Sequence, residues 1–411
     1  MISFAKKIPF QLKSEQIFML SGLLVNAGNY AYNLILGRYL GPTEFADAAI
    51  LITLLLVLSF VAMTYQLAVA KFTLEFDSES SVRFVKWMYR NAIILGVILG
   101  CGMVVFASDL QKLFHTVSSE MFTIFGCVIP LYFAMSVNRG RFQGNSNFVQ
   151  LSGTYQFEMI TRLVVTFFIL FFFQISSSVG VAIGIAVSMI AGLFPFKSMA
   201  GFRKVKGKIS AANQKRILSF LIISASYEGT LIICNNSDIL LVKHFFEAYD
   251  AGLYASLALI GRVVYFITWM FVMLLLPKVI QYRKEGLNTI PILSKYLFYI
   301  TLLCIAIVSF TFIFPDFAVR ILFGEGFLEI SPLLGWYALA TGLFAISNVF
   351  AYYFLSLDHY RPILFAAVMG IVQIILILFF HNNLFEVVLM QITAMGVLLA
   401  LQVGYFRRFA R

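Results

Sequence analysis

Four charged side chains lie inside long apolar runs of this sequence, and their types suit ion binding or anion binding. Glu158 and Arg162 are four positions apart, so in a helix both project from one face. Glu228 and Arg262 stand singly in two later runs. A charge inside an apolar helix costs roughly 3 kcal/mol or more, so we expect these groups to face a protein interior or a wet cavity.

Each charge has a structural and a functional interpretation. Glu158 and Arg162 either neutralise each other as an internal pair that joins helices, or share an ion or substrate site. Glu228 has Ser224 on the same helical face and no cation beside it in the sequence. It is either a coupling-ion or proton-exchange group, or a structural carboxylate with a partner elsewhere. Arg262 is a candidate partner for Glu228 or a ligand for phosphate.

A polar stripe marks the first apolar run. Asn26, Asn29 and Asn33 recur on one helical face, with Tyr30 beside them. Such amides join helices, at only about 0.6 kcal/mol each, or line a wet cavity, and three on one face favour the cavity. The four cysteines and four histidines are scattered. We therefore expect neither a disulfide nor a metal site. The loops predicted outside the membrane are short, so no catalytic residues are assigned and the protein is predicted not to be an enzyme.

The elements that carry these residues follow from composition. The 411 residues are 61% hydrophobic and 12% charged, whereas soluble domains are about half apolar and about a quarter charged. Apolar windows recur at the length that crosses a bilayer, and they do not alternate as barrel strands do. We predict an all-α polytopic membrane protein with 12 transmembrane helices. The predicted spans are 16–37, 48–70, 88–108, 119–138, 148–173, 179–200, 217–235, 251–276, 292–314, 332–355, 363–380 and 386–405.

The distribution of basic residues predicts the orientation. With these spans, 24 of the 30 lysines and arginines fall on one side and four on the other. Basic residues concentrate in cytoplasmic loops, so both termini are predicted to be cytoplasmic in a bacterial inner membrane. The formal net charge of +11 is explained by this topology, and no nucleic-acid partner is expected.

A weak repeat divides the chain in two. The most basic loop, 197–216, separates residues 1–205, with helices 1–6, from residues 206–411, with helices 7–12. Residues 36–40 resemble 241–245, and a second similarity relates the segments after Asp109 and Asp316. The residues at the start of loops in membrane proteins can resemble one another by chance. Two matches separated by the same distance along the chain nevertheless favour an internal duplication. This predicts two parallel six-helix lobes around a central cavity.

Three stretches resemble polysaccharide flippases of the O-antigen (Wzx) type. They are 33–45 (NLILGRYLGPTEF), 236–245 with 250–255, and 322–327 (LFGEGF). The resemblance implies the multidrug/oligosaccharidyl-lipid/polysaccharide exporter superfamily and a fold like that of MATE exporters and lipid flippases. It implies transport of an undecaprenyl-diphosphate-linked oligosaccharide by alternating access, with cavity arginines that attract the diphosphate. Arg262 is the best candidate by position and Arg38 a weaker one. Ala46 and Asp47 depart from the glycine and apolar residue that the family prefers.

The expected function is therefore a flippase with no cofactor, coupled to H+ or Na+. Expected partners are the lipid-linked oligosaccharide, membrane lipids, and the polysaccharide polymerase and chain-length machinery, with the protein itself monomeric. An ion-coupled multidrug or cation exporter of the same superfamily is the nearest alternative. A membrane-embedded polymerase or glycosyltransferase is less consistent with the short outside loops. A major facilitator carrier would need glycine in 71–90, which has none.

Overall fold

Every regular element in the part that the computed structural model describes is a helix. That part comprises residues 14–76, 78–195, 209–265, 275, 279, 282–283, 285–357, 359 and 361–409. Within it, eight helices are long and apolar enough to cross a membrane, or nine if the two arms of a bent helix count together. The chain is a multi-pass membrane protein, as its composition predicts. The number of twelve spans stays a prediction.

The longest element, α1 (Ser14–Glu75), covers the first two predicted spans. It is broken at Gly41, whose φ of 71° lies in the left-handed region that glycine adopts easily. Pro42 follows directly and has no backbone N–H for a helical hydrogen bond. The break therefore comes from the Gly41–Pro42 pair, which was predicted as a loop between two helices.

Thirteen further helices complete the described part, and each predicted span contains a helix, although several helices end before the predicted span does, as α6 does at Ala191. The predicted span 251–276 is described only at residues 251–265 and 275, and the predicted boundary at 205–206 lies outside the described residues. The bounds are α2 (Ser78–Val105), α3 (Ala107–Phe114), α4 (Glu120–Gly144), α5 (Phe148–Phe172), α6 (Ser177–Ala191), α8 (Ala211–Phe245), α9 (Ala248–Gly261), α11 (Ile290–Ile313), α12 (Pro315–Leu322), the 3₁₀ helix η1 (Glu325–Leu333), α13 (Leu334–Ser356), α14 (Arg361–Phe379) and α15 (Leu384–Phe409).

The helices form two compact units that are discontinuous in sequence. Unit 1 contains residues 1–33, 62–107 and 120–222, and unit 2 contains 34–61, 108–119 and 223–411. The chain therefore passes from one unit to the other five times. The predicted division into residues 1–205 and 206–411 stays a prediction.

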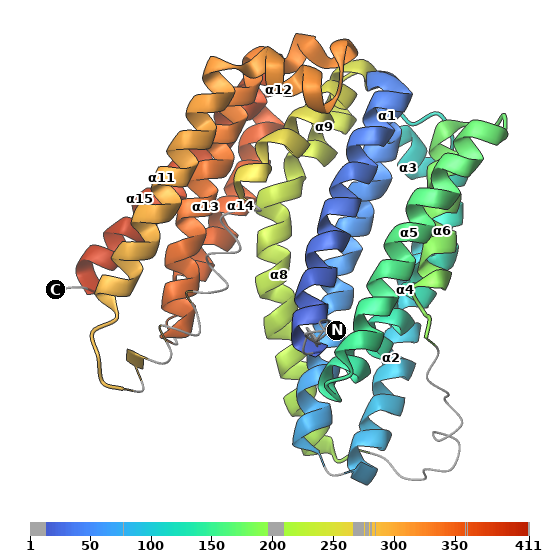
Figure 1. Cartoon of the computed structure of the whole chain (residues 1–411), viewed down its shortest axis with the longest axis vertical. Helices are drawn as coiled ribbons and strands as arrows, with labels where there is room; N and C mark the ends of the chain where they lie inside the picture. The colour runs from blue at the N-terminus through green and yellow to red at the C-terminus, as the bar shows by residue number, and fades with distance from the viewer. Residues whose placement is uncertain are drawn as a thin grey trace, which may run out of the picture. The chain divides into compact units, whose positions relative to one another are not determined.

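Unit 1 is built on helices that approach closely. α4 packs against α2 and α6, and α5 packs against α6 (Figure 1). A Cβ atom added to Gly100 of α2 would lie 2.4 Å from the carbonyl oxygen of Gly126 in α4. Small residues at such a crossing let two membrane helices meet at backbone distance.

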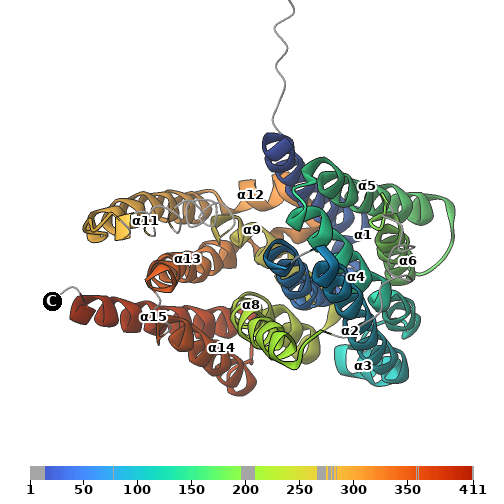
Figure 2. The ribbon, with the colours of Figure 1, turned by 90° about the horizontal axis from the view of Figure 1, so that it is seen from below.

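In unit 2, α13 packs between α11 and α15, and α14 packs against α15 (Figures 1 and 2). The segments after Asp109 and Asp316, which the repeat relates, both form eight-residue helices, α3 and α12. Residues 34–61 of α1 pack in this unit through Phe45, whose ring lies 5.7 Å from that of Phe323. A Cβ atom on Gly252 of α9 would lie only 1.7 Å from the Pro42 carbonyl oxygen.

Candidate functional site

Two guanidinium groups face a single carboxylate in unit 1. Glu158 and Arg162 come from α5, one turn apart, and Arg139 comes from the last part of α4. Arg139 Nη2 lies 2.7 Å from Glu158 Oε2, and Arg162 Nη2 lies 2.8 Å from Glu158 Oε1. The three side chains are 5%, 10% and 11% exposed in chain order. This Arg139–Glu158–Arg162 cluster therefore buries one positive charge in excess.

Arg139 is the more firmly held of the two guanidinium groups. Its Nε donates to Thr154 Oγ1 and its Nη2 to the Thr154 carbonyl oxygen, both at 3.0 Å. Its Cζ lies 3.9 Å from the centre of the Tyr155 ring, a close cation–π contact. The Tyr155 hydroxyl in turn donates to Gln66 Oε1 at 3.0 Å. With its donors engaged in this way, Arg139 orients Glu158.

Arg162 has fewer contacts than Arg139. Besides Glu158, its neighbour is the ring of Tyr32 in α1, 6.0 Å from Arg162 Cζ. Tyr32 is itself placed by a hydrogen bond between its hydroxyl and Thr166 Oγ1, at 3.3 Å. Arg162 Nε has no hydrogen-bond partner among the described residues. Since a guanidinium carries five N–H donors, Arg162 can bind Glu158 and an incoming anion together.

The predicted asparagine stripe lies on the first arm of α1, in unit 1. Asn26 is exposed, whereas Asn29 and Asn33 are half-buried. Asn33 Nδ2 donates to the Asn29 carbonyl oxygen at 2.8 Å, so this amide is bonded within its own helix. Asn33 Oδ1 is buried and has no hydrogen-bond partner within the described part. A role of the stripe in lining a wet cavity stays a prediction.

Arg38 contacts the end of a short helix in unit 2. Its Nη2 donates to the carbonyl oxygens of Arg320, at 3.0 Å, and Ile321, at 2.5 Å. Both carbonyls belong to the last turn of α12, where helical partners are missing. Arg38 therefore caps α12, and its suggested contact with phosphate stays a prediction.

Arg262 belongs to a neutral buried network in unit 2. Its Nη2 lies 3.1 Å from Asp238 Oδ1, and its Nη1 donates to Asn236 Oδ1 at 3.1 Å. Asp238 Oδ2 accepts from the hydroxyls of Tyr254, at 3.2 Å, and Tyr337, at 2.8 Å. The carboxylate partner of Arg262 is thus Asp238, and the suggested pairing with Glu228 is wrong.

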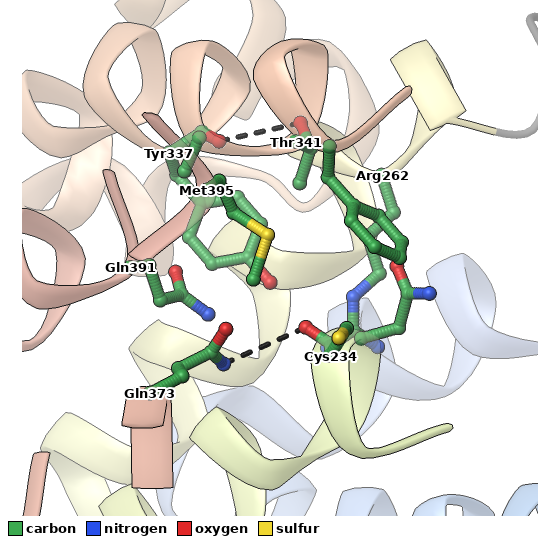
Figure 3. Close-up of a pocket in the computed structure, with 10 residues that line it drawn as sticks. Cys234, Arg262, Tyr337, Thr341, Gln373, Gln391 and Met395 are labelled. Carbon is green, nitrogen blue, oxygen red and sulfur yellow. Dashed lines mark hydrogen bonds between the residues drawn. The ribbon is translucent and has the colours of Figure 1, made fainter. Parts of the chain in front are cut away.

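A small cavity adjoins this network (Figure 3). Figure 3 shows Gln373 and Gln391 pointing into it, with Cys234 opposite. Gln373 Nε2 donates to Ser237 Oγ at 3.2 Å, while Gln373 Oε1 is buried without a hydrogen-bond partner in the described part. The cavity volume of about 10 Å³ suits one water molecule at most. It is far too small for a saccharide or a drug.

Glu228 differs from the other buried carboxylates. It lies in α8 just before a 52° bend between the arms Ala211–Thr230 and Ile232–Phe245. Ser224, one turn earlier, is half-buried as Glu228 is. No salt bridge or hydrogen bond joins the Glu228 carboxylate to another described residue, although Tyr265 lies near enough to interact with it electrostatically. Nor do three His, Cys, Asp or Glu residues of the described part converge as metal ligands.

Unit 2 contains another buried ion pair besides Arg262–Asp238, and its two residues, Asp47 and Lys243, lie between the predicted spans. Lys243 Nζ lies 2.8 Å from Asp47 Oδ1 in unit 2, at an angle outside hydrogen-bond geometry. The side chains are only 2% and 4% exposed. Asp47 Oδ2 also accepts the backbone N–H of Val117 at 2.9 Å. Asp47 and Lys243 were interpreted as charges in outside loops, so their burial corrects that interpretation.

Comparison with known proteins now identifies the chain. A family model described as polysaccharide biosynthesis protein matches residues 35–332. The chain belongs to this family. Comparison with curated proteins gives no match. The family model spans Glu158, Arg162 and Arg262 as well as the ion pair of Asp47 and Lys243, so every buried charge pair described above lies inside it.

Solved structures show the fold that this family member adopts. An inward-facing multidrug resistance MATE transporter of the MOP superfamily is similar with a TM-score of 0.76 and 13% identity, over 93% of this chain and 95% of that one. The lipid II flippase MurJ, in an inward closed conformation, has a TM-score of 0.76 and 16% identity, over 95% and 87%. A eukaryotic MATE transporter has a TM-score of 0.64 and 14% identity, over 96% and 95%. The predicted fold class is thereby confirmed.

Proposed function

We propose that this polysaccharide biosynthesis protein moves an undecaprenyl-diphosphate-linked oligosaccharide from the cytoplasmic to the periplasmic leaflet of a bacterial inner membrane. The observation that carries the proposal is the Arg139–Glu158–Arg162 cluster, which buries an excess positive charge in the first unit. A diphosphate is anionic and rich in acceptor oxygens. Guanidinium groups bind such groups with paired, charge-assisted hydrogen bonds.

Arg162 is the proposed phosphate ligand within the cluster. Arg139 is occupied by Glu158, Thr154 and the Tyr155 ring. Arg162 has an ion pair only with the other Glu158 oxygen within the described part, at 2.8 Å, and its Cζ lies 6.0 Å from the centre of the Tyr32 ring. Arg262 in unit 2 has a carboxylate of its own in Asp238, so it offers an incoming anion less net charge.

The same charge balance disfavours the export of cations. A cationic drug needs a carboxylate or an electron-rich face at its site, and Glu158 is bound by two guanidinium groups. The net positive cluster would repel such a drug. An anionic cargo is therefore the better fit to unit 1.

Transport of this kind forms no covalent bond, so the task of the protein is to replace water around a polar headgroup. In the proposed alternating-access cycle the saccharide and diphosphate pass through the protein interior while the polyprenyl chain stays in lipid. Opening toward the periplasm requires contacts at that end to break and reform. The Asp47–Lys243 pair, at the end predicted to be periplasmic, is one of them.

Glu228 is the proposed coupling group for H+ or Na+. Its carboxylate has no ion pair among the described residues, and it sits beside the bend in α8. A half-buried carboxylate without a fixed counterion can exchange a proton or bind a cation. Binding of a proton or Na+ at Glu228 would then shift the conformational equilibrium of the bend in α8, and with it the transport cycle.

The test uses a strain that lacks its own copy of the gene and measures delivered surface polysaccharide. A charge-assisted hydrogen bond is worth about 1.5–3 kcal/mol, so Arg162→Gln should lower transport by about 10- to 100-fold. Arg162→Lys keeps the charge and should retain part of the activity. Arg83→Gln is the matched control, because Arg83 pairs with Glu79 at a surface where the two side chains are 27% and 67% exposed.

Two outcomes would overturn the proposal. Normal polysaccharide delivery by Arg162→Gln at wild-type expression would remove Arg162 from the site. Sensitivity to cationic drugs with unchanged polysaccharide in the deletion strain would replace the flippase by an exporter. Glu228→Gln should abolish the response of transport to the H+ or Na+ gradient, and an unchanged response would refute the coupling role.

A further inference from the structure

A second polar cavity lies in unit 1, at the end of the unit where α4 ends, and its Arg141 comes two residues after Arg139 of the Arg139–Glu158–Arg162 cluster. Its volume is about 280 Å³. The end of α1, the first turns of α2 and the end of α4 enclose it. The lining residues are Thr73, Phe76, Ser81, Val82, Val85, Arg141 and Asn145. By the distribution of basic residues, this end of the unit is the predicted cytoplasmic one.

The polar part of the lining suits an anion. None of the seven lining side chains is acidic, and Arg141, Asn145, Ser81 and Thr73 all carry hydrogen-bond donors. Arg141 is positioned by a hydrogen bond with Tyr89. Since a guanidinium has five N–H donors and is always charged, Arg141 can hold Tyr89 and an anion at once.

Two described carboxylates close to the lining residues along the chain, Glu75 and Glu79, are paired with arginines. Glu75 lies 2.7 Å from Arg216 Nη2, and Glu79 lies 3.0 Å from Arg83 Nη1. Neither side chain lines the cavity. The lining therefore offers a cation no carboxylate ligand, while an anion meets a guanidinium.

The Thr73 hydroxyl points to a ligand with acceptor oxygens. Thr73 Oγ1 is buried and has no hydrogen-bond partner within the described part of the chain. Leaving a buried hydroxyl unsatisfied costs about 1–3 kcal/mol. A phosphate oxygen at this position would accept from Thr73 and Arg141 together.

The rest of the lining is apolar. Phe76, Val82 and Val85 form the wall beside the polar groups, so the site suits a charged group joined to hydrocarbon. The volume lies just below the usual range of roughly 300–1,000 Å³ for small-molecule sites, so it fits a headgroup and excludes an oligosaccharide.

We propose that this cavity binds the phosphate group of a lipid at the predicted cytoplasmic face. Two lipids present that chemistry: an anionic phospholipid, and the diphosphate-linked polyprenyl lipid that is the proposed cargo. Binding here requires no transport, so the inference stands separately from the flippase proposal.

The experiment measures lipid retention by the full-length protein in detergent, by native mass spectrometry. Each phosphate lipid has a neutral counterpart: phosphatidylglycerol with diacylglycerol, and undecaprenyl diphosphate with undecaprenol. We expect at least one phosphate lipid to bind ten-fold or more tightly than its counterpart. The pair that shows this difference identifies the source of the phosphate.

Variants connect that difference to the cavity. Arg141→Gln should weaken binding of the phosphate lipid by ten-fold or more, and Thr73→Val, which keeps the side-chain shape, by several-fold. Arg90→Gln removes an exposed cation that does not line the cavity, so it should change binding less than two-fold. Thermal unfolding checks that each variant is folded.

The proposal is overturned if phosphate lipids bind no better than their neutral counterparts, or if folded Thr73→Val and Arg141→Gln bind like the wild type. Arg162→Gln separates this site from the transport site. It should lose polysaccharide delivery, and the phosphate-lipid binding that it retains should fall ten-fold or more when Arg141→Gln is added, so failure of one proposal is distinguishable from failure of the other.

Discussion

The buried ion pair between Asp47 and Lys243 allows a quantitative test of how unit 2 is held together. Its charged atoms are 2.8 Å apart, and the side chains are 4% and 2% exposed. At an effective dielectric constant near 20, two charges at this distance attract by about 6 kcal/mol. Desolvation offsets much of that attraction. Removing one partner, however, leaves the other buried and unpaired, which costs about 3–5 kcal/mol.

We therefore expect Asp47→Asn and Lys243→Met each to lower the free energy of unfolding by about 3–5 kcal/mol. The side-chain amide of Asp47→Asn can still accept a hydrogen bond from the Val117 N–H, so this variant tests the loss of the negative charge alone. The exchanged pair, Asp47→Lys with Lys243→Asp, restores opposite charges and should be about 2 kcal/mol more stable than the sum of its two single variants, Asp47→Lys and Lys243→Asp, predicts. Equilibrium unfolding by denaturant in detergent micelles measures all five variants.

The matched control is Glu79→Gln, which breaks the exposed pair with Arg83 and should cost less than about 1 kcal/mol. If Asp47→Asn cost no more than Glu79→Gln, or if the coupling energy of the exchanged pair were near zero, the argument from burial would be refuted.

Two further variants test unit 2. Asp238→Asn leaves the Arg262 guanidinium buried without its carboxylate. The free energy of unfolding should therefore fall by about 3–5 kcal/mol. A decrease below about 1 kcal/mol would contradict the ion pair between Arg262 and Asp238. Gly252→Ala would bring a Cβ atom to 1.7 Å from the Pro42 carbonyl oxygen, whereas Gly404→Ala meets no atom within 4 Å. Size-exclusion chromatography should therefore show loss of folded Gly252→Ala protein, while Gly404→Ala should be neutral or stabilising by up to about 1 kcal/mol; equal yields of the two would rule out the close approach.

Contacts within one helix could be predicted from the sequence. The pairing of Glu158 with Arg162 follows from their spacing of four residues and is confirmed at 2.8 Å. The start of α5 at Phe148 was also predicted, because the apolar run begins there. Hydrophobic length and helical period depend only on local sequence, which explains these successes.

Contacts between helices could not be predicted in this way. Arg139 was assigned to a cytoplasmic loop because the predicted span ended at residue 138, but α4 continues to Gly144. Gly140 lies inside this extension, so the local sequence contained no signal that the helix continues. The partner of Arg262 was missed for a related reason. The helical period predicts which residues share one face of a helix. Which two faces are in contact depends on how whole helices pack, and the period does not contain that information.

The burial of Asp47 and Lys243 shows the same limit at a span end. Hydropathy ends the predicted seventh span at residue 235, whereas α8 continues to Phe245 and carries Lys243 into the protein. A charged residue weakens the apolar signal of its own window. A prediction from hydropathy therefore places such a charged residue in a loop, although it lies in the helix and is paired there.

The discontinuous make-up of unit 2 also has a consequence for biosynthesis. Its first segment, 34–61, is translated long before its largest segment, 223–411, and only the short segment 108–119 is made between them. Asp47 precedes Lys243 by 196 residues. At about 5–20 residues per second, the ribosome needs roughly 10–40 s to supply the partner. Until then the Asp47 carboxylate must be solvated by water. The part of α1 around residue 47 therefore reaches its native contacts only late in synthesis.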